Sequence, residues 1–323
     1  MHYLQTNYDT VQKPLFGSPG VGKPKHVLAS SDLSPSDVRL TLDTAKLLKR
    51  ARKFAPKPVT LVENRVLAMI FEKQSLRTRV TFETAMVELG GHAIYLTKSD
   101  IDMGNRESVA DVAANLSRWC SLIVARLNRH STLLELAEHS GVPVINALTD
   151  GEHPCQALAD LQTIEEKLGP GKKKLTYIGD GNNVANSFAV TAAKLGHEVV
   201  ICSPPGYECE DPVYDYPNVN QSYDPVAAVT GADAVYTDVW VSMGQEDEEQ
   251  ERLQRFANYQ VNGKLMSKAK PGAIFLHCLP ARRGLEVTEE VIDGPQSVIY
   301  DQAENRLHAQ KALMKLLLDG VLE

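Results

Sequence analysis

The chain has 323 residues, 43% hydrophobic and 23% charged, a length that suits two globular domains rather than one. Its net charge of −7 argues against broad nucleic-acid binding, which needs a basic surface. No apolar run approaches the roughly 18 residues that cross a bilayer, and the first residues do not resemble a signal peptide, so we expect a cytoplasmic protein without membrane contact. Five cysteines without a CxxC pair favour neither a disulfide framework nor a zinc site.

Short apolar segments alternate with helical ones along most of the chain. After a loose arm of about thirty residues, a helix begins near Ser34 with a capping pattern. Apolar strands are expected at 66–71, 93–96, 122–125, 142–148, 175–178, 199–202, 234–237, 273–276 and 298–300. This alternation predicts an α/β fold with two doubly wound parallel-sheet domains joined by helices. A last helix, about 305–318, is expected to cross back to the first domain.

We place the domain border near residue 150. The first domain is expected to cover residues 1–150, completed by the C-terminal helix at about 305–323, and the second to cover residues 151–304. A helix at about 154–167 links them. Since open parallel sheets bind ligands beyond the carboxyl ends of their strands, the residues that follow each apolar segment are the first candidates for a site.

The segment 75–79, Ser-Leu-Arg-Thr-Arg, opens a helix directly after the strand at 66–71. Free backbone N–H groups and the helix dipole attract anions there, and the arginines Arg77 and Arg79 oppose the dipole unless an anion compensates them. The guanidinium fork fits phosphate. The alternative is that both arginines lie on the surface and pair with acids. Neither a GxxxxGK(S/T) loop nor a GxGxxG fingerprint is present, which disfavours P-loop and nicotinamide enzymes.

Three further motifs follow predicted strands or open a helix. His153 and Gln156 share one helix face and could both donate to a carbonyl oxygen, or could be a helix cap and a solvated amide. Asp238 ends its strand and could pair with a substrate amine or cap a turn. Cys278 could be a small buried apolar residue or, with His277, a metal ligand, but no ligand spacing supports a metal site.

Together these motifs resemble those of the aspartate and ornithine carbamoyltransferase family. Phe71-Glu72-Lys73 followed by the segment 75–79 resembles the carbamoyl-phosphate signature, and His153-Pro154-Cys155-Gln156 is similar to the HPxQ motif. The segments at 180–183, 238–244 and 277–280 resemble the ornithine-using branch, and the resemblance runs from about residue 30 to the C-terminus.

The resemblance implies a reaction. The first domain would bind carbamoyl phosphate and the second ornithine, and the carbamoyl group would pass to the side-chain amine of L-ornithine, giving L-citrulline and phosphate in arginine metabolism. It implies no metal and no organic cofactor, and a homotrimer or a multiple of trimers. The alternatives are a related acceptor (N-acylornithine or putrescine) and a catalytically silent regulatory relative.

The resemblance also implies roles for individual residues. The carbamoyl-phosphate set is Ser75, Leu76, Arg77, Thr78, Arg126, His153, Gln156, Cys278, Leu279 and Arg306, with Arg79 in support. The ornithine set is Asn183, Asp238, Ser242 and Met243. The catalytic set is Arg126, His153, Gln156, Asp238, Cys278 and Arg306.

Two positions depart from the family pattern. Leu76 stands where Thr is common, a place where the backbone N–H can make the contact. Asp102 stands where Gln or His commonly reaches a neighbouring subunit's phosphate site. Because a carboxylate repels phosphate, either Arg106 makes that contact instead, with Asp102 paired to it or turned to solvent, or the loop does not reach across to the neighbouring subunit; we favour the first.

Overall fold

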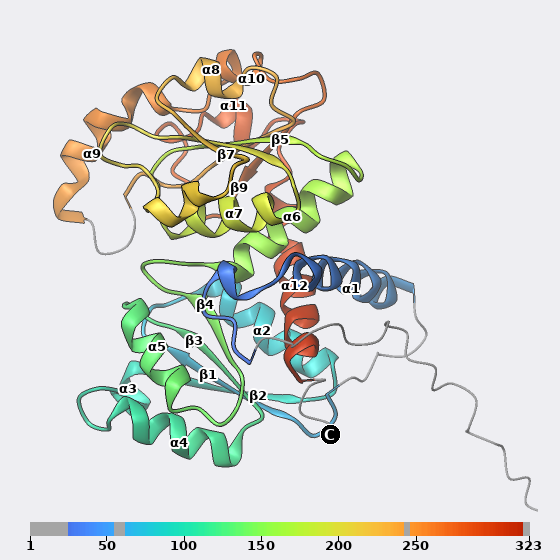
Figure 1. The fold of residues 1–323 in the computed structure, drawn as a ribbon, viewed down its shortest axis with the longest axis vertical. Helices are drawn as coiled ribbons and strands as arrows, with labels where there is room; N and C mark the ends of the chain where they lie inside the picture. Colours follow the sequence, from blue (N-terminus) through green and yellow to red (C-terminus); the bar gives the residue numbers. More distant parts are fainter. Residues whose placement is uncertain (1–24, 55–61, 242–245, 319–323) are drawn as a thin grey trace, which may run out of the picture.

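The computed structural model describes residues 25–54, 62–241 and 246–318, which form two α/β halves, one below the other in Figure 1. The first half contains a four-stranded parallel sheet in the order β2-β1-β3-β4. Its strands are β1 (Val66–Phe71), β2 (His92–Thr97), β3 (Leu122–Arg126) and β4 (Val144–Leu148). Its helices are η1 (Ser30–Asp32), α1 (Pro35–Phe54), α2 (Leu76–Glu88), α3 (Lys98–Ile101), α4 (Val109–Trp119) and α5 (His130–Glu138).

The second half contains a five-stranded parallel sheet in the order β7-β6-β5-β8-β9. Its strands are β5 (Lys174–Ile178), β6 (Glu198–Cys202), β7 (Val219–Ser222), β8 (Ala234–Thr237) and β9 (Ile274–His277). Its helices are α7 (Asn183–Lys194), η2 (Asp211–Asp215), α8 (Pro225–Val229), η3 (Glu246–Glu248), α9 (Glu249–Phe256), η4 (Ala257–Tyr259), α10 (Gly263–Met266) and α11 (Glu289–Ile292).

The central strands β1, β3, β5 and β8 are buried on both faces, as parallel sheets covered by helices require, whereas the edge strand β2 is only partly buried. In β1, Leu67 and Met69 belong to the core shared with α2, whereas Ala68 and Ile70 belong to a separate core with α4 and α5. Successive side chains of a strand point to opposite faces, so one continuous apolar segment serves two cores. This is why the strands lack the alternating pattern of a half-exposed sheet.

Two long helices join the halves: α6 (Pro154–Leu168) and α12 (Ile299–Leu318). α12 returns from the second sheet to pack against α1, α2 and α6, as Figure 1 shows. A single apolar cluster includes Met69 of β1, Leu161 of α6, Tyr177 of β5 and Leu313 of α12, so the two sheets share a core. The predicted fold class is therefore confirmed, while the assignment of residues to domains stays a prediction. No helix within the described ranges is long and apolar enough to cross a membrane.

Two sequence-based predictions need correction. The strand predicted at 298–300 is wrong, because α12 already begins at Ile299. The residues just before it are nevertheless extended: Phe275 of β9 donates its N–H to Gln296 O and accepts from Val298 N–H. The edge strand β7 was not predicted, because three of its four residues are polar and only Val219 is buried.

Each sheet has one point where the strand order reverses direction. In the first sheet it lies between β1 and β3, and in the second between β5 and β8. Ligands of open parallel sheets bind at such points. Gly181 follows β5 and packs so closely on the backbone of Glu208 and Cys209 that a Cβ atom would lie 2.2 Å from Glu208 C, so this loop requires glycine.

The buried His308 of α12 predicts a pH-dependent stability. Its ring nitrogens have no hydrogen-bond partner among the described residues, and burial, with the charge of Lys311, lowers its pKa to about 4. Below the usual histidine pKa the unfolded chain binds a proton at this position that the folded chain does not. As the pH is lowered from about 6.5 to about 4, the free energy of unfolding should therefore decrease by on the order of 1 kcal/mol per pH unit.

Denaturant unfolding at pH 7 and pH 5 checks this prediction. His308→Leu should remove this part of the pH dependence, whereas His139→Gln, at an exposed position, should not. An unchanged pH dependence in His308→Leu would contradict the role given to burial.

Candidate active site

A cavity of about 1230 Å³ lies between the two points where the sheets reverse. It is bounded by the loops after β1 and β3 on one side and those after β5, β8 and β9 on the other. All of the predicted site residues that the structure describes line it: Ser75, Leu76, Arg77, Thr78, Arg126, His153, Gln156, Asn183, Asp238, Cys278, Leu279 and Arg306. Ser242 and Met243 lie outside the described residues. Residues spread over more than 230 positions of the chain thus share one cavity.

The α2 N-terminus forms one end of the cavity. The Ser75 hydroxyl caps the helix by accepting from Thr78 N–H at 3.2 Å, while the Leu76 side chain is exposed and offers only its backbone here. Arg77 reaches over the cavity and donates to the carbonyl of Leu279 in the other half. Arg79 does not line the cavity: its guanidinium stacks 3.7 Å from the Tyr95 ring centroid and pairs with Glu83. The expected support from Arg79 to this site is therefore absent in this arrangement.

Three arginines gather at this end of the cavity. Arg126 and Arg306 are buried, and neither they nor Arg77 form an ion pair with a carboxylate in the described ranges. Burial, followed by the charges of Arg306 and Arg77, lowers the pKa of Arg126 to about 10. The guanidiniums thus raise one another's energy in a partly dry cavity, and an anion placed among them would relieve that cost.

Arg306 connects the two halves at the centre of the cavity. Its Nη1 donates to Gln156 Oε1 at 2.7 Å, and its Nη2 donates to Thr78 Oγ1 at 3.1 Å. The Gln156 amide therefore turns its oxygen, not its nitrogen, toward Arg306. The expectation that His153 and Gln156 both donate to one oxygen is not met here, because Gln156 Nε2 donates to Asp160 instead.

His153 is buried at the start of α6, and its backbone N–H donates to Ser187 Oγ at 2.7 Å. Burial, followed by the charges of Arg306 and Arg126, holds the pKa of His153 well below its usual value. The imidazole is therefore neutral at neutral pH. Its Nδ1 has no partner among the described residues, so one ring nitrogen can donate while the other accepts.

The opposite end of the cavity presents a carboxylate. Asp238 Oδ1 accepts from the Cys278 thiol at 3.0 Å, and Oδ2 accepts from Asn182 Nδ2 at 3.1 Å. Burial, followed by the charge of Asp238, raises the pKa of Cys278 well above its usual value, so the thiol stays protonated. The cavity therefore has a cationic end that suits an anion and an anionic end that suits an ammonium group.

A second carboxylate near this end is already paired. Asp180 Oδ2 accepts from Arg252 Nη1 at 2.9 Å, in a contact that is largely buried. Burial raises the pKa of Asp180 to about 6 despite that partner. Asn183, the first residue of α7, donates from Nδ2 to the Thr149 carbonyl and so bridges to the first half. Unlike Asp180, Asp238 has no guanidinium partner in the described part of the chain; its side-chain partners are the Cys278 thiol and the Asn182 amide.

Asp238, His277 and Cys278 have ligand atoms within 4.8 Å of one another, a spacing that could suit a metal ion. However, both ring nitrogens of His277 already have partners. Nδ1 accepts from Leu279 N–H at 2.9 Å, and Nε2 lies 3.1 Å from Glu286 Oε1. The trio would have to rearrange before the imidazole could bind a metal, and the absence of a metal stays a prediction.

Comparison with known proteins matches both halves. Residues 25–166 match the family model "Aspartate/ornithine carbamoyltransferase, carbamoyl-P binding domain", and residues 171–317 match "Aspartate/ornithine carbamoyltransferase, Asp/Orn binding domain". The chain belongs to the aspartate/ornithine carbamoyltransferase family. It is 50% identical to an ornithine carbamoyltransferase of Pyrococcus abyssi (93% of this chain, 97% of the relative) and 50% identical to that of Bacillus subtilis (91% and 94%).

Solved structures agree with the family assignment. The structure resembles an ornithine carbamoyltransferase from Pyrococcus furiosus with a TM-score of 0.89 at 48% identity, covering 92% of this chain and 98% of that one. It resembles the Thermus thermophilus enzyme with a TM-score of 0.84 at 46% identity (91% and 99%). The resemblance inferred from the motifs is thus confirmed.

Asp102 is the C-cap of α3, and its backbone is left-handed with φ 39°. The Asp102 side chain accepts from Asn105 Nδ2 at 3.1 Å and does not form the expected pair with the Arg106 guanidinium. Arg106 is exposed and contacts Asp102 only through its backbone N–H, which donates to the Asp102 carbonyl at 3.0 Å. Whether this loop reaches a second subunit stays a prediction.

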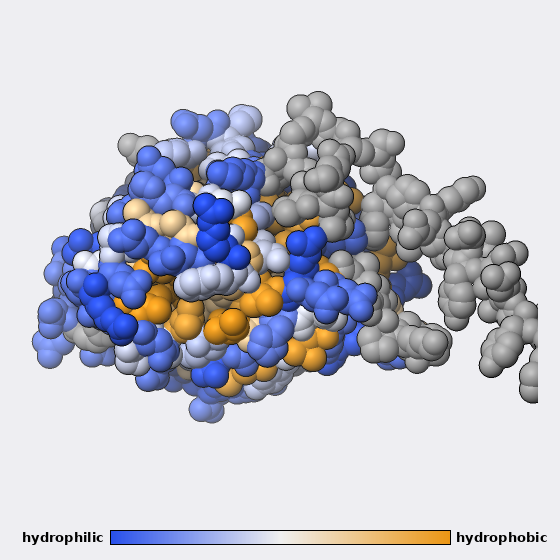
Figure 2. Space-filling view, turned by 90° about the horizontal axis from the view of Figure 1, so that it is seen from below, coloured by the Kyte–Doolittle hydropathy of each residue, from blue (hydrophilic) through white to orange (hydrophobic). Residues whose placement is uncertain are grey.

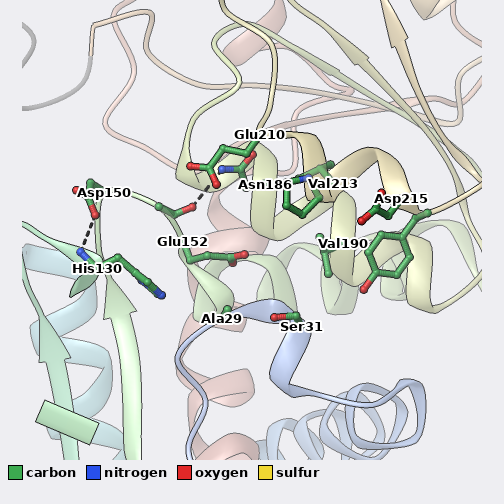
Figure 3. Close-up of a pocket in the computed structure, with 13 residues that line it drawn as sticks. Ala29, Ser31, His130, Asp150, Glu152, Asn186, Val190, Glu210, Val213 and Asp215 are labelled. Carbon is green, nitrogen blue, oxygen red and sulfur yellow. Dashed lines mark hydrogen bonds between the residues drawn. The ribbon is translucent and has the colours of Figure 1, made fainter. Parts of the chain in front are cut away.

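A second pocket of about 810 Å³ lies beside residues 150–152, in the loop between β4 and α6 (Figure 3). Its lining includes the carboxyl groups of Asp150, Glu152, Glu210 and Asp215. Burial raises the pKa of Glu152 although Ser187 and Ser30 donate to it. Asp150 and Glu210 also line the larger cavity, but the lining of the smaller pocket includes no lysine or arginine, whereas Arg77, Arg126 and Arg306 line the larger one. The arginine end of the larger cavity is therefore the better place for an anion.

The motif analysis missed three polar residues at the cavity, of which Arg252 lines it and Asp160 and Gln302 lie behind its lining residues. Asp160, Gln302 and Arg252 were given no role, yet all three are buried and hydrogen-bonded to residues of the cavity or its loops. A signal existed for two of them. Asp160 lies four residues after Gln156, and Gln302 four before Arg306, so each shares a helix face with a predicted site residue. Nothing in the sequence pairs Arg252 with Asp180.

The contact between Asp238 and Cys278 predicts how the thiol reacts. Because the pKa of Cys278 is raised, iodoacetamide should alkylate Cys278 more slowly than a free surface thiol at pH 8. Asp238→Asn removes the neighbouring charge, lowers that pKa and should speed the reaction several-fold. Mass spectrometry of the peptide containing Cys278 measures the rate. When unfolded, the unaltered protein and Asp238→Asn should react at equal rates. Equal rates in the two folded proteins would contradict the described contact.

Proposed function

We propose that the protein transfers the carbamoyl group of carbamoyl phosphate to the side-chain amine of L-ornithine, giving L-citrulline and phosphate. The observation that carries the proposal is the polarity of the cavity. Three arginines, from α2, β3 and α12, lie at one end, and the carboxylate of Asp238, which has no ion-pair partner among the described residues, lies at the other. This suits one anionic and one ammonium-bearing substrate. The names of the relatives from Pyrococcus abyssi and Bacillus subtilis support the same reaction.

We assign the phosphate group to the α2 N-terminus. The backbone N–H groups of the first turn, with the side chains of Ser75, Arg77 and Thr78, would hold it, because an anion there offsets the helix dipole and the guanidinium charges. The carbamoyl oxygen would lie against Arg126, Arg306 and neutral His153. The carbamoyl nitrogen donates hydrogen bonds, and we assign it to Gln156 Oε1 and the Leu279 carbonyl, which face the cavity as acceptors.

We assign the amino-acid acceptor to the other end. Asp238 would pair with the ammonium group of ornithine, and Asn183, with Ser242 and Met243, would hold the rest of the amino-acid end. Cys278 lies between Asp238 and the arginine end, beside the place where the reacting amine would enter. As a protonated thiol it would contribute shape and a weak hydrogen bond, not nucleophilic attack.

In the reaction, the neutral side-chain amine attacks the carbamoyl carbon. A C–N bond forms, negative charge grows on the carbamoyl oxygen, and the C–O bond to phosphate breaks as phosphate leaves with the electron pair. The attacking nitrogen loses one proton, which the departing phosphate takes up. Arg126, Arg306 and His153 would stabilise the growing oxyanion, and the helix N-terminus would stabilise the leaving phosphate. Holding both substrates in one cavity further increases the rate, because the amine and the carbamoyl carbon are kept close together and correctly oriented.

Two alternative functions have specific discriminators. An enzyme for putrescine would gain nothing from groups that bind a carboxylate, and one for N-acylornithine would lose the ammonium group that Asp238 attracts. A silent regulatory relative would not need the site to be complete. The described part of this cavity contains chemically competent groups at both ends, which favours the ornithine enzyme.

We also propose that the chain assembles as a homotrimer or a multiple of trimers. Figure 2, which looks at the first half from below, shows apolar side chains gathered between charged ones. Exposed large apolar residues of this half include Leu76, Val80, Val87, Ile94 and Trp119. Strand β2 is an unpaired edge of its sheet, and a contiguous apolar surface beside such an edge is typical of an interface.

We further propose a biosynthetic role in arginine metabolism and a cytoplasmic location. The Pyrococcus furiosus relative, 48% identical over 92% of this chain, is named as an anabolic enzyme. The five cysteines are free thiols, which fits a reducing compartment.

An acceptor panel tests the proposed function. The purified protein, given carbamoyl phosphate with ornithine, N-acetylornithine, putrescine or aspartate, should form citrulline from ornithine at a rate well above the other products. Asp238→Asn keeps the side-chain shape and removes its charge. We expect it to lower kcat/KM for ornithine by about a hundredfold or more, as for the loss of a buried charge partner, with carbamoyl-phosphate binding little changed. Preference for another acceptor, or equal weakening of both substrates in Asp238→Asn, would contradict the assignment.

A further inference from the structure

Asp160 lies on α6, one turn after Gln156, and is fully buried between α6 and α12. It lines no part of the cavity, and the proposed reaction gives it no role. A carboxylate in such a place costs free energy unless several donors satisfy it. Its position therefore requires an explanation.

One oxygen of Asp160 accepts two hydrogen bonds from amide groups. Gln156 Nε2 donates to Oδ1 at 2.7 Å from the same helix, and Gln302 Nε2 donates to the same oxygen at 2.7 Å from α12. An ionised carboxylate can only accept. Each amide must therefore turn its nitrogen toward Asp160 and its oxygen away.

The orientation of both amides has consequences at the cavity. The Gln156 oxygen points to Arg306, which lines the cavity, and the Gln302 oxygen accepts from His277 N–H at 3.0 Å, at the end of β9 next to Cys278. Without Asp160 each amide nitrogen would lose its acceptor, and each amide would be held at its oxygen alone, by Arg306 for Gln156 and by the His277 N–H for Gln302. An amide held at one end is less firmly oriented than one held at both, because its nitrogen and oxygen have similar size. When Arg306 turns to a bound ligand, the Gln156 amide could then present an N–H group to the cavity where it now presents an oxygen.

We propose that Asp160 is a positioning residue: by orienting the Gln156 amide, it makes the cavity select a carbamoyl group over an acyl group that carries methyl in place of the amino group. The inference rests on the proposed function. A carbamoyl nitrogen donates hydrogen bonds and is matched by the Gln156 oxygen, whereas a methyl group is not. If the amide could rotate, its N–H would face the carbamoyl N–H, and only the carbamoyl ligand would be penalised.

The test compares three ligands: carbamoyl phosphate, acetyl phosphate and inorganic phosphate. Their dissociation constants are measured by calorimetry at pH 8, where Asp160 is ionised, since burial raises its pKa to about 7. In Asp160→Ala the affinity ratio of carbamoyl phosphate to acetyl phosphate should fall by about tenfold or more. Inorganic phosphate has no carbamoyl group and would bind only at the α2 N-terminus. Its dissociation constant should therefore stay within about twofold of that of the unaltered protein.

A matched control lies one turn further along the same helix contact. Thr163 is equally buried, and its Oγ1 accepts from Asn305 Nδ2 of α12 at 2.9 Å without touching the cavity. Thr163→Ala should lower thermal stability and leave the affinity ratio unchanged. Asp160→Asn keeps an acceptor oxygen and should restore most of the ratio, and an Asp160→Asn protein that behaves like Asp160→Ala would overturn the orientation argument.

The remaining outcomes are also decisive. Asp160→Leu fills the space and removes the same acceptor, so it replaces Asp160→Ala if that variant does not fold; failure of both to fold would assign Asp160 a structural role and overturn the proposal. A normal ratio in a folded Asp160→Ala or Asp160→Leu protein would overturn it as well. If the unaltered protein itself prefers acetyl phosphate or forms no citrulline, the proposed function fails, which is a separate result.

Discussion

The structure depends on one electrostatic problem: three guanidinium groups share a partly dry cavity without a carboxylate partner among the described residues. Arg77 comes from the start of α2, Arg126 from the end of β3 and Arg306 from α12. Burial and mutual repulsion lower the pKa of Arg126. A protein that maintains such a cluster bears a cost in stability that an anionic ligand removes, and this cost indicates where the phosphate-bearing substrate binds.

The long return of α12 is what brings these charges together. The helix leaves the second sheet, packs on α1, α2 and α6, and places Arg306 in contact with Gln156 on one side and Thr78 on the other. The two halves therefore share a core as well as a site. Arg306 donates to Thr78, which lies 228 positions earlier in the chain. A change in how the halves pack would therefore move groups that we assign to the reaction.

The part of the site that could be predicted from the sequence follows from the geometry of parallel sheets. Within each sheet the carboxyl ends of parallel strands lie at one edge, which brings together the residues after β1 and β3 in the first sheet and those after β5, β8 and β9 in the second. That the two edges face one cavity is shown by the structure. Ser75, Arg126 and Asp238 could be found in this way. Arg252 could not, because its partner Asp180 lies 72 residues away. For Asp160 the sequence offers only its spacing from Gln156, since its other partner, Gln302, lies 142 residues away. The same limit applies to Arg79 and Arg77, which look alike in sequence although only Arg77 turns toward the cavity.

The affinity of two single variants for carbamoyl phosphate tests the central account most directly. Arg77→Ala removes a guanidinium that lines the cavity, whereas Arg79→Ala removes one from the same helical turn that stacks on Tyr95 outside it. Calorimetry should show binding at least about thirtyfold weaker in Arg77→Ala, equivalent to about 2 kcal/mol or more, and nearly unchanged binding in Arg79→Ala. Equal affinities in the two variants would show that the arginine cluster at the α2 N-terminus is not the anion site.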